Sequence, residues 1–244
     1  MTTIPSDDPA AVAATEAVQQ GDLSALRRLL DEHPGLAATR IGSADPGAMS
    51  RTLLHVATDW PGHHPRVAKV IALLVDRGAD VDARFAGPHE ETPLHWAASC
   101  DDVEAVDALL DAGADIEAPG AVLGGGTPIA DARGFKQWAA ARRLLERGAT
   151  TTLIDAATLG LDDRVRAALA DGATLEDITT AFWGACHGGR RSTAELLLSA
   201  GADPNRIPPW SDLTPLDAAQ EEGADDLVAW LRAQGARSAT DGAV

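Results

Sequence analysis

The stretch Leu109-Leu110-Asp111-Ala112-Gly113-Ala114-Asp115 holds the pattern that organises the whole chain. An apolar helix end runs into Gly-Ala, and related stretches contain glycines spaced 35, 35, 24, 29 and 34 residues apart: Gly78, Gly113, Gly148, Gly172, Gly201 and Gly235. Glycine is favoured just past a helix end because the chain turns left-handed there and a Cβ would clash. A recurring period of this size predicts a stacked repeat.

A helix-start pattern lies upstream of these glycines. It is clearest as Thr92-Pro93-Leu94-His95-Trp96-Ala97-Ala98, with related starts at Thr52, Thr127 and Thr214. A threonine hydroxyl can cap the free amides of the first turn, and proline suits the first helical position. Each unit is therefore predicted to be a cap, a short helix, a turn and a second helix that ends at glycine.

The stretch from Thr92 to Ala97 resembles the Thr-Pro-Leu-His-x-Ala signature of the ankyrin repeat, and the resemblance covers the chain from about residue 11 to residue 236. It implies an all-α ankyrin-repeat solenoid of about seven helix-turn-helix units with short β-hairpin fingers. We expect a disordered lead at residues 1–9, a single ankyrin-repeat domain at 10–236 and a C-terminal tail at 237–244. Fingers are expected at 81–91, 116–126 and 204–213, whereas residues 36–51 read as a long loop.

The later repeats depart from the family pattern. Where the family has its structural histidine, repeats four to seven place Ala130, Ile154, Trp183 and Asp217. Repeats four, five and six also follow one another with almost no room for a finger. Because the stability of a repeat protein is roughly a sum of unit and neighbour contributions, we expect repeats four to six to be its weakest part.

Composition narrows the class of protein. A net charge of -17 argues against general binding to nucleic acid or to an anionic membrane surface, and favours a cationic partner. The cysteines, Cys100 and Cys186, fall in different repeats without a CxxC spacing, so neither a zinc site nor a disulfide framework is predicted. Residues 1–10 do not read as a signal peptide, and no apolar run is long enough to span a bilayer. We expect a cytoplasmic monomer, and the scarcity of lysine hints at a GC-rich bacterial genome.

The resemblance implies a concave binding face made of finger tips and the exposed positions of each first helix. Carried over by position, with one finger residue added, the candidate partner-binding residues are Asp59, Trp60, Trp96, Asp131, Phe135, Asp155, Leu159, His187 and Trp210. Four of them would form an apolar band beside three carboxylates, which suits a partner protein or peptide with basic and apolar groups. The alternative is that these aromatic side chains pack under the fingers, as large apolar residues usually do.

We therefore expect a non-catalytic protein–protein interaction module without a cofactor. Adjacent histidines at 63 and 64 point in different directions, so no metal site is predicted. One alternative is an enzyme that uses Asp131, Asp155 or His187 as acid or base. A second is an inhibitor or immunity-type protein that covers a basic enzyme surface. A third is a purely structural or small-molecule-binding solenoid.

Overall fold

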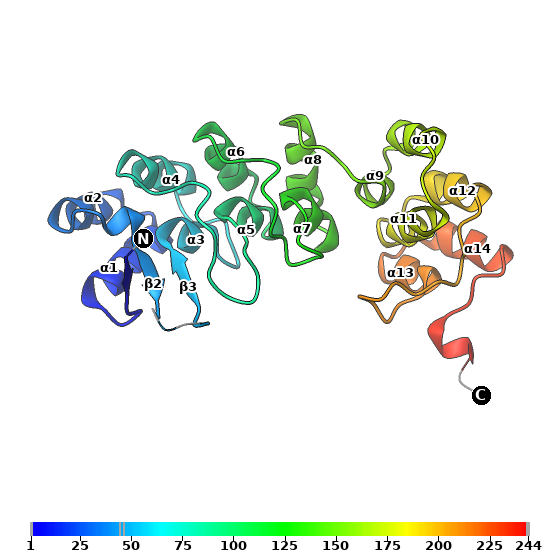
Figure 1. Ribbon diagram of the computed structural model, residues 1–244, viewed down its shortest axis with the longest axis horizontal. Helices are drawn as coiled ribbons and strands as arrows, with labels where there is room; N and C mark the ends of the chain where they lie inside the picture. The colour runs from blue at the N-terminus through cyan, green and yellow to red at the C-terminus, as the bar shows by residue number, and fades with distance from the viewer. Residues whose placement is uncertain (1, 44, 46, 243–244) are drawn as a thin grey trace. The chain divides into compact units, whose positions relative to one another are not determined.

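The computed structural model describes residues 2–43, 45 and 47–242, and the chain forms two compact units, Met1–Thr150 and Thr151–Val244 (Figure 1). The helices of the first unit are α1 (Pro9–Gln20), α2 (Leu23–Glu32), α3 (Leu53–Thr58), α4 (Val67–Asp76), α5 (Pro93–Ser99), α6 (Val103–Asp111), α7 (Pro128–Gly134) and α8 (Trp138–Glu146). Those of the second unit are α9 (Leu153–Leu159), α10 (Asp162–Ala170), α11 (Leu175–His187), α12 (Arg191–Ser199), α13 (Pro215–Glu221) and α14 (Asp225–Ala233).

Within each unit the helices form two layers. In the first unit α1, α3, α5 and α7 pack in sequence order, and α2, α4, α6 and α8 pack as a second layer, drawn above them in Figure 1. In the second unit α11 packs between α9 and α13, and α10 packs against α12. Among the described residues this gives seven helix pairs, which confirms the predicted all-α repeat solenoid.

The six repeat glycines have the role that their spacing predicts. Each has a positive φ, between 84° at Gly235 and 101° at Gly148. The alanine after each glycine donates its backbone N–H to a carbonyl of the last helical turn, as Ala114 does to Leu109 at 3.0 Å. This Schellman-type ending stops the second helix and sends the chain back toward the next first helix.

The N-terminal part contains a small sheet that the sequence reading missed. Strands β1 (Thr3–Ile4), β2 (Arg40–Gly42) and β3 (Ser50–Thr52) lie in the order β1-β2-β3, parallel and then antiparallel. The expected disordered lead therefore holds a strand, and the expected loop at 36–51 holds a hairpin. The hairpin is stabilised by the buried side chain of Ile41 and by Arg40, whose guanidinium donates to Ser50 and to the carbonyl of Arg84.

Fingers are present in the first unit and missing at the start of the second. The finger at 116–126 is closed by bonds from Gly120 to Gly125 and from Ala121 to Gly126, at 3.0 and 2.9 Å. No finger fits between α8 and α9 or between α10 and α11, as predicted. Instead, α11 runs for 13 residues, about twice the length of the other first helices from α3 onward. After α14, a 3-10 helix (Ala239–Gly242) ends the described chain, and the last two residues of the expected tail lie outside it.

The boundary between the two units falls where the first finger is missing, next to Thr150 and Thr151. We therefore expect backbone amides of α8, α9 and α10 to exchange with deuterium faster than those of α4 to α6. Hydrogen-exchange mass spectrometry on the full chain measures this directly. Equal protection in all of these helices would contradict the expected weak zone.

Candidate partner-binding groove

A groove of about 330 Å³ opens at the C-terminal ends of three successive first helices of the first unit. We call it the aromatic groove. Its lining comes from the ends of α3, α5 and α7 and from the two fingers between them: Thr58, Asp59, Trp60, Glu91, Trp96, Ser99, Cys100, Val122, Phe135 and Gln137. The structure thus brings Asp59, Trp60, Trp96 and Phe135 of the predicted set to one place.

The three aromatic walls of the groove differ in how firmly they are held. Trp96 is half-buried, and its ring meets the rings of His55 and Phe85 at centroid distances of 4.9 and 5.3 Å. Trp60 and Phe135 are 76% and 44% exposed. Trp96 is therefore a fixed wall, and the other two are apolar surfaces open to a partner.

Trp96 is held in place by the local helix start. Thr92 and His95 form a capping box, in which His95 Nδ1 accepts the Thr92 backbone N–H at 3.1 Å. His55 makes the same arrangement with Thr52 at the start of α3. Burial lowers the pKa of His55 to about 3 and that of His95 to about 4, so both rings are neutral near pH 7.

The second ring nitrogen of each histidine ties its repeat to the next one. Since Nδ1 accepts, Nε2 carries the proton and donates to a backbone carbonyl. In repeat six an indole N–H makes the equivalent bond. The acceptor lies just before the next helix cap in all three cases: His55 to Glu91 at 3.1 Å, His95 to Gly126 at 3.3 Å and Trp183 to Leu213 at 2.9 Å. Repeat six thus keeps the bond of the signature histidine with a different side chain.

Two carboxylates line the aromatic groove. Asp59 forms an ion pair with Arg51, and its side chain also accepts the backbone N–H of Trp60 at 2.9 Å. Glu91 is 7% exposed, and its Oε2 atom is closed to water without a hydrogen-bond partner among the described residues. Sequence reasoning missed Glu91, because it reads as one of two adjacent acidic residues on a solvated finger.

Asp131 does not lie on an exposed face, contrary to the expectation. Its side chain is fully buried, and it accepts backbone N–H groups of Leu123 and Val122 from the finger before α7. Burial is the main cause that raises the pKa of Asp131 to about 7; the nearby charge of Glu91 acts in the same direction, and the two backbone bonds act against it. Asp131 fastens the finger that carries Val122 into the groove wall.

Asp155 was also expected to be exposed, and it is buried. The cap of α9 is Thr152, one residue later than the predicted repeat start, so Asp155 takes the place of the signature histidine. Its carboxylate accepts the Thr152 backbone N–H at 2.8 Å and the hydroxyl at 2.5 Å. Asp155 is only 3% exposed. Its carboxylate therefore caps the helix and is not part of an open face.

The remaining predicted residues belong to the second unit. Leu159 is half-buried at the end of α9. His187 stacks on Trp183 with a centroid distance of 5.1 Å and an interplanar angle of 13°. Trp210, 54% exposed, meets Trp183 edge-on at 6.4 Å.

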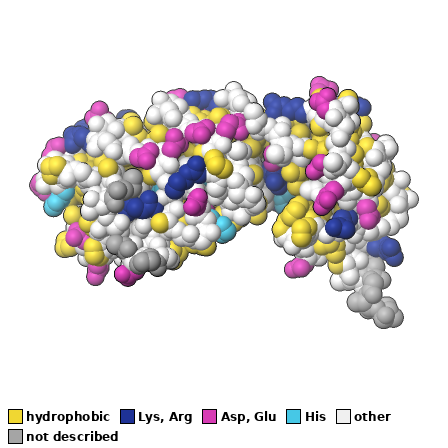
Figure 2. All heavy atoms as spheres, viewed as in Figure 1, with side chains coloured by type: hydrophobic (Ala, Val, Ile, Leu, Met, Phe, Trp, Pro, Cys, Tyr) yellow, Lys and Arg dark blue, Asp and Glu magenta, His cyan; other side chains and the backbone are white. Residues whose placement is uncertain are grey.

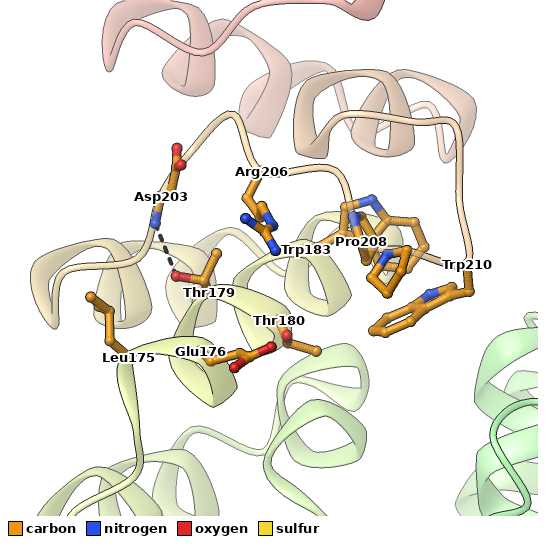
Figure 3. A pocket seen from close by; sticks show the side chains of 10 residues that line it. Leu175, Glu176, Thr179, Thr180, Trp183, Asp203, Arg206, Pro208 and Trp210 are labelled. Carbon is orange, nitrogen blue, oxygen red and sulfur yellow. Dashed lines mark hydrogen bonds between the residues drawn. The ribbon is translucent and has the colours of Figure 1, made fainter.

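Trp183 and Trp210 line a hollow of about 510 Å³ in the second unit (Figure 3). Its far side is formed by Leu175, Glu176 and Thr180 at the extended start of α11. Arg206 reaches over it, and the hydroxyl of Thr179 accepts the backbone N–H of Asp203 at 3.2 Å. Acidic and basic side chains thus share this lining.

The described residues contain no group of three or more His, Cys, Asp or Glu side chains placed to hold a metal ion. Cys100 and Cys186 are both buried, and burial raises the pKa of Cys100 to about 11 and that of Cys186 above its usual range. Over the described part of the chain, every helix is too short or too polar to cross a bilayer.

Comparison with known proteins agrees with this architecture. The model of the family "Ankyrin repeats (3 copies)" matches residues 13–120. No curated protein matches the chain in sequence. Among solved structures, the crystal structure of the human ASB11 ankyrin repeat domain is similar, with a TM-score of 0.52 and 22% identity over 92% of this chain and 97% of that chain. The family match lies in the first unit and the ankyrin-repeat fold continues through the second, and together they support an ankyrin-repeat protein.

Proposed function

We propose that this protein is a non-catalytic recognition protein that binds a partner protein or peptide through the aromatic groove. Ankyrin repeats are generally protein–protein interaction modules, and such domains are typically non-catalytic. The observation that carries the proposal is the pair of exposed aromatic side chains, Trp60 and Phe135, beside the fixed ring of Trp96. Exposed aromatic residues around a groove are typical anchors of protein interfaces.

The groove is largely preorganised before a partner binds. Its size is that of a site for one or two side chains, and Trp96 is already fixed by the capping box and the rings around it. Binding therefore costs little ordering of this wall, and the apolar area of Trp60 and Phe135 contributes to affinity. On the face drawn in Figure 2, acidic side chains occur on both units. With the net charge of -17, they favour a basic partner in general, while the groove selects it.

The residues named for an enzymatic alternative have structural contacts instead. Asp131 fastens a finger, Asp155 caps α9 and His187 stacks on Trp183. None of the three is among the residues that line the aromatic groove or the hollow of the second unit. No observation in the described structure favours an enzyme or an inhibitor of a basic enzyme over the recognition proposal.

The test is a double variant, Trp60→Ala with Phe135→Ala, because both rings are exposed and their removal leaves the core intact. The full chain is used to capture proteins from its native host, and affinity for each retained protein is then measured by calorimetry. Removal of an interface anchor costs about 2 kcal/mol, so the double variant is expected to weaken binding at least about 30-fold.

Trp210→Ala serves as the matched control, since it removes an exposed aromatic ring from the other unit. Binding that falls with Trp210→Ala and not with the double variant would move the site to the second unit. If the wild type, the double variant and Trp210→Ala all retain the same partner equally well, recognition through either aromatic surface is contradicted.

A further inference from the structure

The carboxylate of Glu91 has an unusual position for a charged group. The residue is 7% exposed and lines the aromatic groove, and one of its carboxylate oxygens has no hydrogen-bond partner among the described residues. An ionised carboxylate in such a place is costly unless a cation or donor reaches it. Glu91 therefore lines the groove with a carboxylate whose hydrogen-bonding capacity the described residues do not fill.

The backbone around Glu91 is fixed before any partner arrives. Its carbonyl accepts the Phe85 N–H at 2.7 Å and the Nε2–H of His55 at 3.1 Å. The next residue, Thr92, is the cap of α5. The carboxylate is consequently presented from a rigid part of the finger, which lowers the ordering cost of binding.

The charges around the groove are complementary to a cation. Its ionisable lining consists of Asp59, Glu91 and the buried thiol of Cys100, and it contains no Lys, Arg or His. Arg51 is engaged by Asp59, and Arg84 donates to the carbonyls of Glu90 and Pro119. His55 and His95, which lie behind the finger, are neutral near pH 7.

The aromatic walls favour a flat cation over a compact one. A guanidinium stacks on tryptophan faces and is more weakly hydrated than an ammonium group, so it enters a half-closed apolar groove at lower cost. It also donates charge-assisted N–H bonds to a carboxylate. The rings of Trp60, Trp96 and Phe135 supply the stacking surface, and Glu91 supplies the carboxylate.

We propose that the aromatic groove receives an arginine side chain of the partner, with its guanidinium on the carboxylate of Glu91 and its stem against Trp60, Trp96 and Phe135. This rests on the proposed function and adds the chemistry of the residue that is recognised. Lysine, and a neutral side chain of the same shape, bind more weakly at this place.

The experiment follows the indole N–H signals of the ¹⁵N-labelled full chain, which has six tryptophans, during titration with acetyl-Leu-Arg-Leu-amide. The signals of Trp60 and Trp96 are expected to shift and saturate. The same peptide with citrulline, a neutral isostere of arginine, is expected to bind at least about tenfold more weakly, and the lysine peptide to fall between them.

Two glutamate variants give the matched comparison. Glu91→Gln removes the buried charge and keeps the shape, and it is expected to weaken the arginine peptide about tenfold. Glu90→Gln makes the same change on the adjacent exposed residue and is expected to alter affinity less than about twofold, as for an exposed charge. Circular dichroism checks that both variants keep their helices.

Each contrary result has its own meaning. Equal binding of the arginine and citrulline peptides, equal losses in the two glutamate variants, or no shift of Trp60 and Trp96 at millimolar peptide would each overturn the arginine proposal. If the captured partner still depends on Trp60 and Phe135, the groove remains the recognition site with another chemistry. If the partner also binds the double variant normally, the proposed function at this groove fails as well.

Discussion

Replacing Trp183 with alanine is expected to lower the free energy of unfolding of the second unit by about 3–5 kcal/mol. Trp183 is 6% exposed, and it lies beside the fully buried Phe182 in the same helix. The variant removes the packing of a large ring and leaves the carbonyl of Leu213 without the indole N–H that it now accepts. Urea unfolding followed by circular dichroism measures the loss, and hydrogen exchange locates it in α11 and α13.

Trp183→His is the informative companion variant, because histidine is the residue that makes this bond in repeats two and three. It is expected to be more stable than Trp183→Ala, since an Nε2–H can still reach the Leu213 carbonyl. Trp210→Ala, which truncates an exposed ring that touches Trp183 edge-on, is expected to cost less than about 1 kcal/mol. Equal losses for the histidine and alanine variants would show that packing alone, and not the bond between repeats, stabilises this place.

The repeat frame is readable from sequence because its signals are local. A glycine after the second helix and a threonine before the first helix each report a backbone conformation that few other residues satisfy. The replacement of the signature histidine by Trp183 was also visible in the sequence. That an indole N–H makes the same bond was not, because it depends on where the carbonyl of Leu213 lies after folding.

Whether the carboxylates of Asp131 and Asp155 are exposed or buried could not be predicted from the sequence in the same way. The doublet Thr151-Thr152 allows either residue to cap α9, and the choice moves Asp155 from an exposed position to the cap. For Asp131 the register was right, but its partners are backbone N–H groups in the finger, which has no sequence signal of its own. Single-residue shifts and loop closure are decided by packing with neighbours, which a periodicity does not report.

In the candidate groove, too, some residues could be predicted from the sequence and one could not. Trp60, Trp96 and Phe135 were found because the repeat frame assigns equivalent positions along successive first helices, and the structure places them around one groove. Glu91 was missed because two adjacent glutamates on a finger usually face solvent. The signal that could have found it is its place just before Thr92, since that residue's carbonyl receives the bond from the preceding repeat and is held against the helices.

Asp131→Asn is expected to make the first unit more stable at pH 8 than the wild type, with a smaller gain at pH 5. Burial raises the pKa of Asp131 from 3.8 to about 7, so the folded protein holds a proton that the unfolded chain releases. Stability is therefore lost as pH rises from about 4 to about 7, and it stays lower above that range. A shift of this size corresponds to about 4 kcal/mol in total, of which about 2.5 kcal/mol falls between pH 5 and pH 8.

Asparagine resembles the protonated acid, because its amide oxygen can still accept the N–H groups of Val122 and Leu123 while its side chain stays neutral at every pH. The difference between variant and wild type should accordingly grow with pH, as measured by urea unfolding at pH 5, 6, 7 and 8. Asp163→Asn, at an exposed position in the first turn of α10, should give only a small difference in stability. A constant difference at Asp131 would mean that its carboxylate is ionised throughout, and that the two finger N–H groups outweigh the cost of its burial.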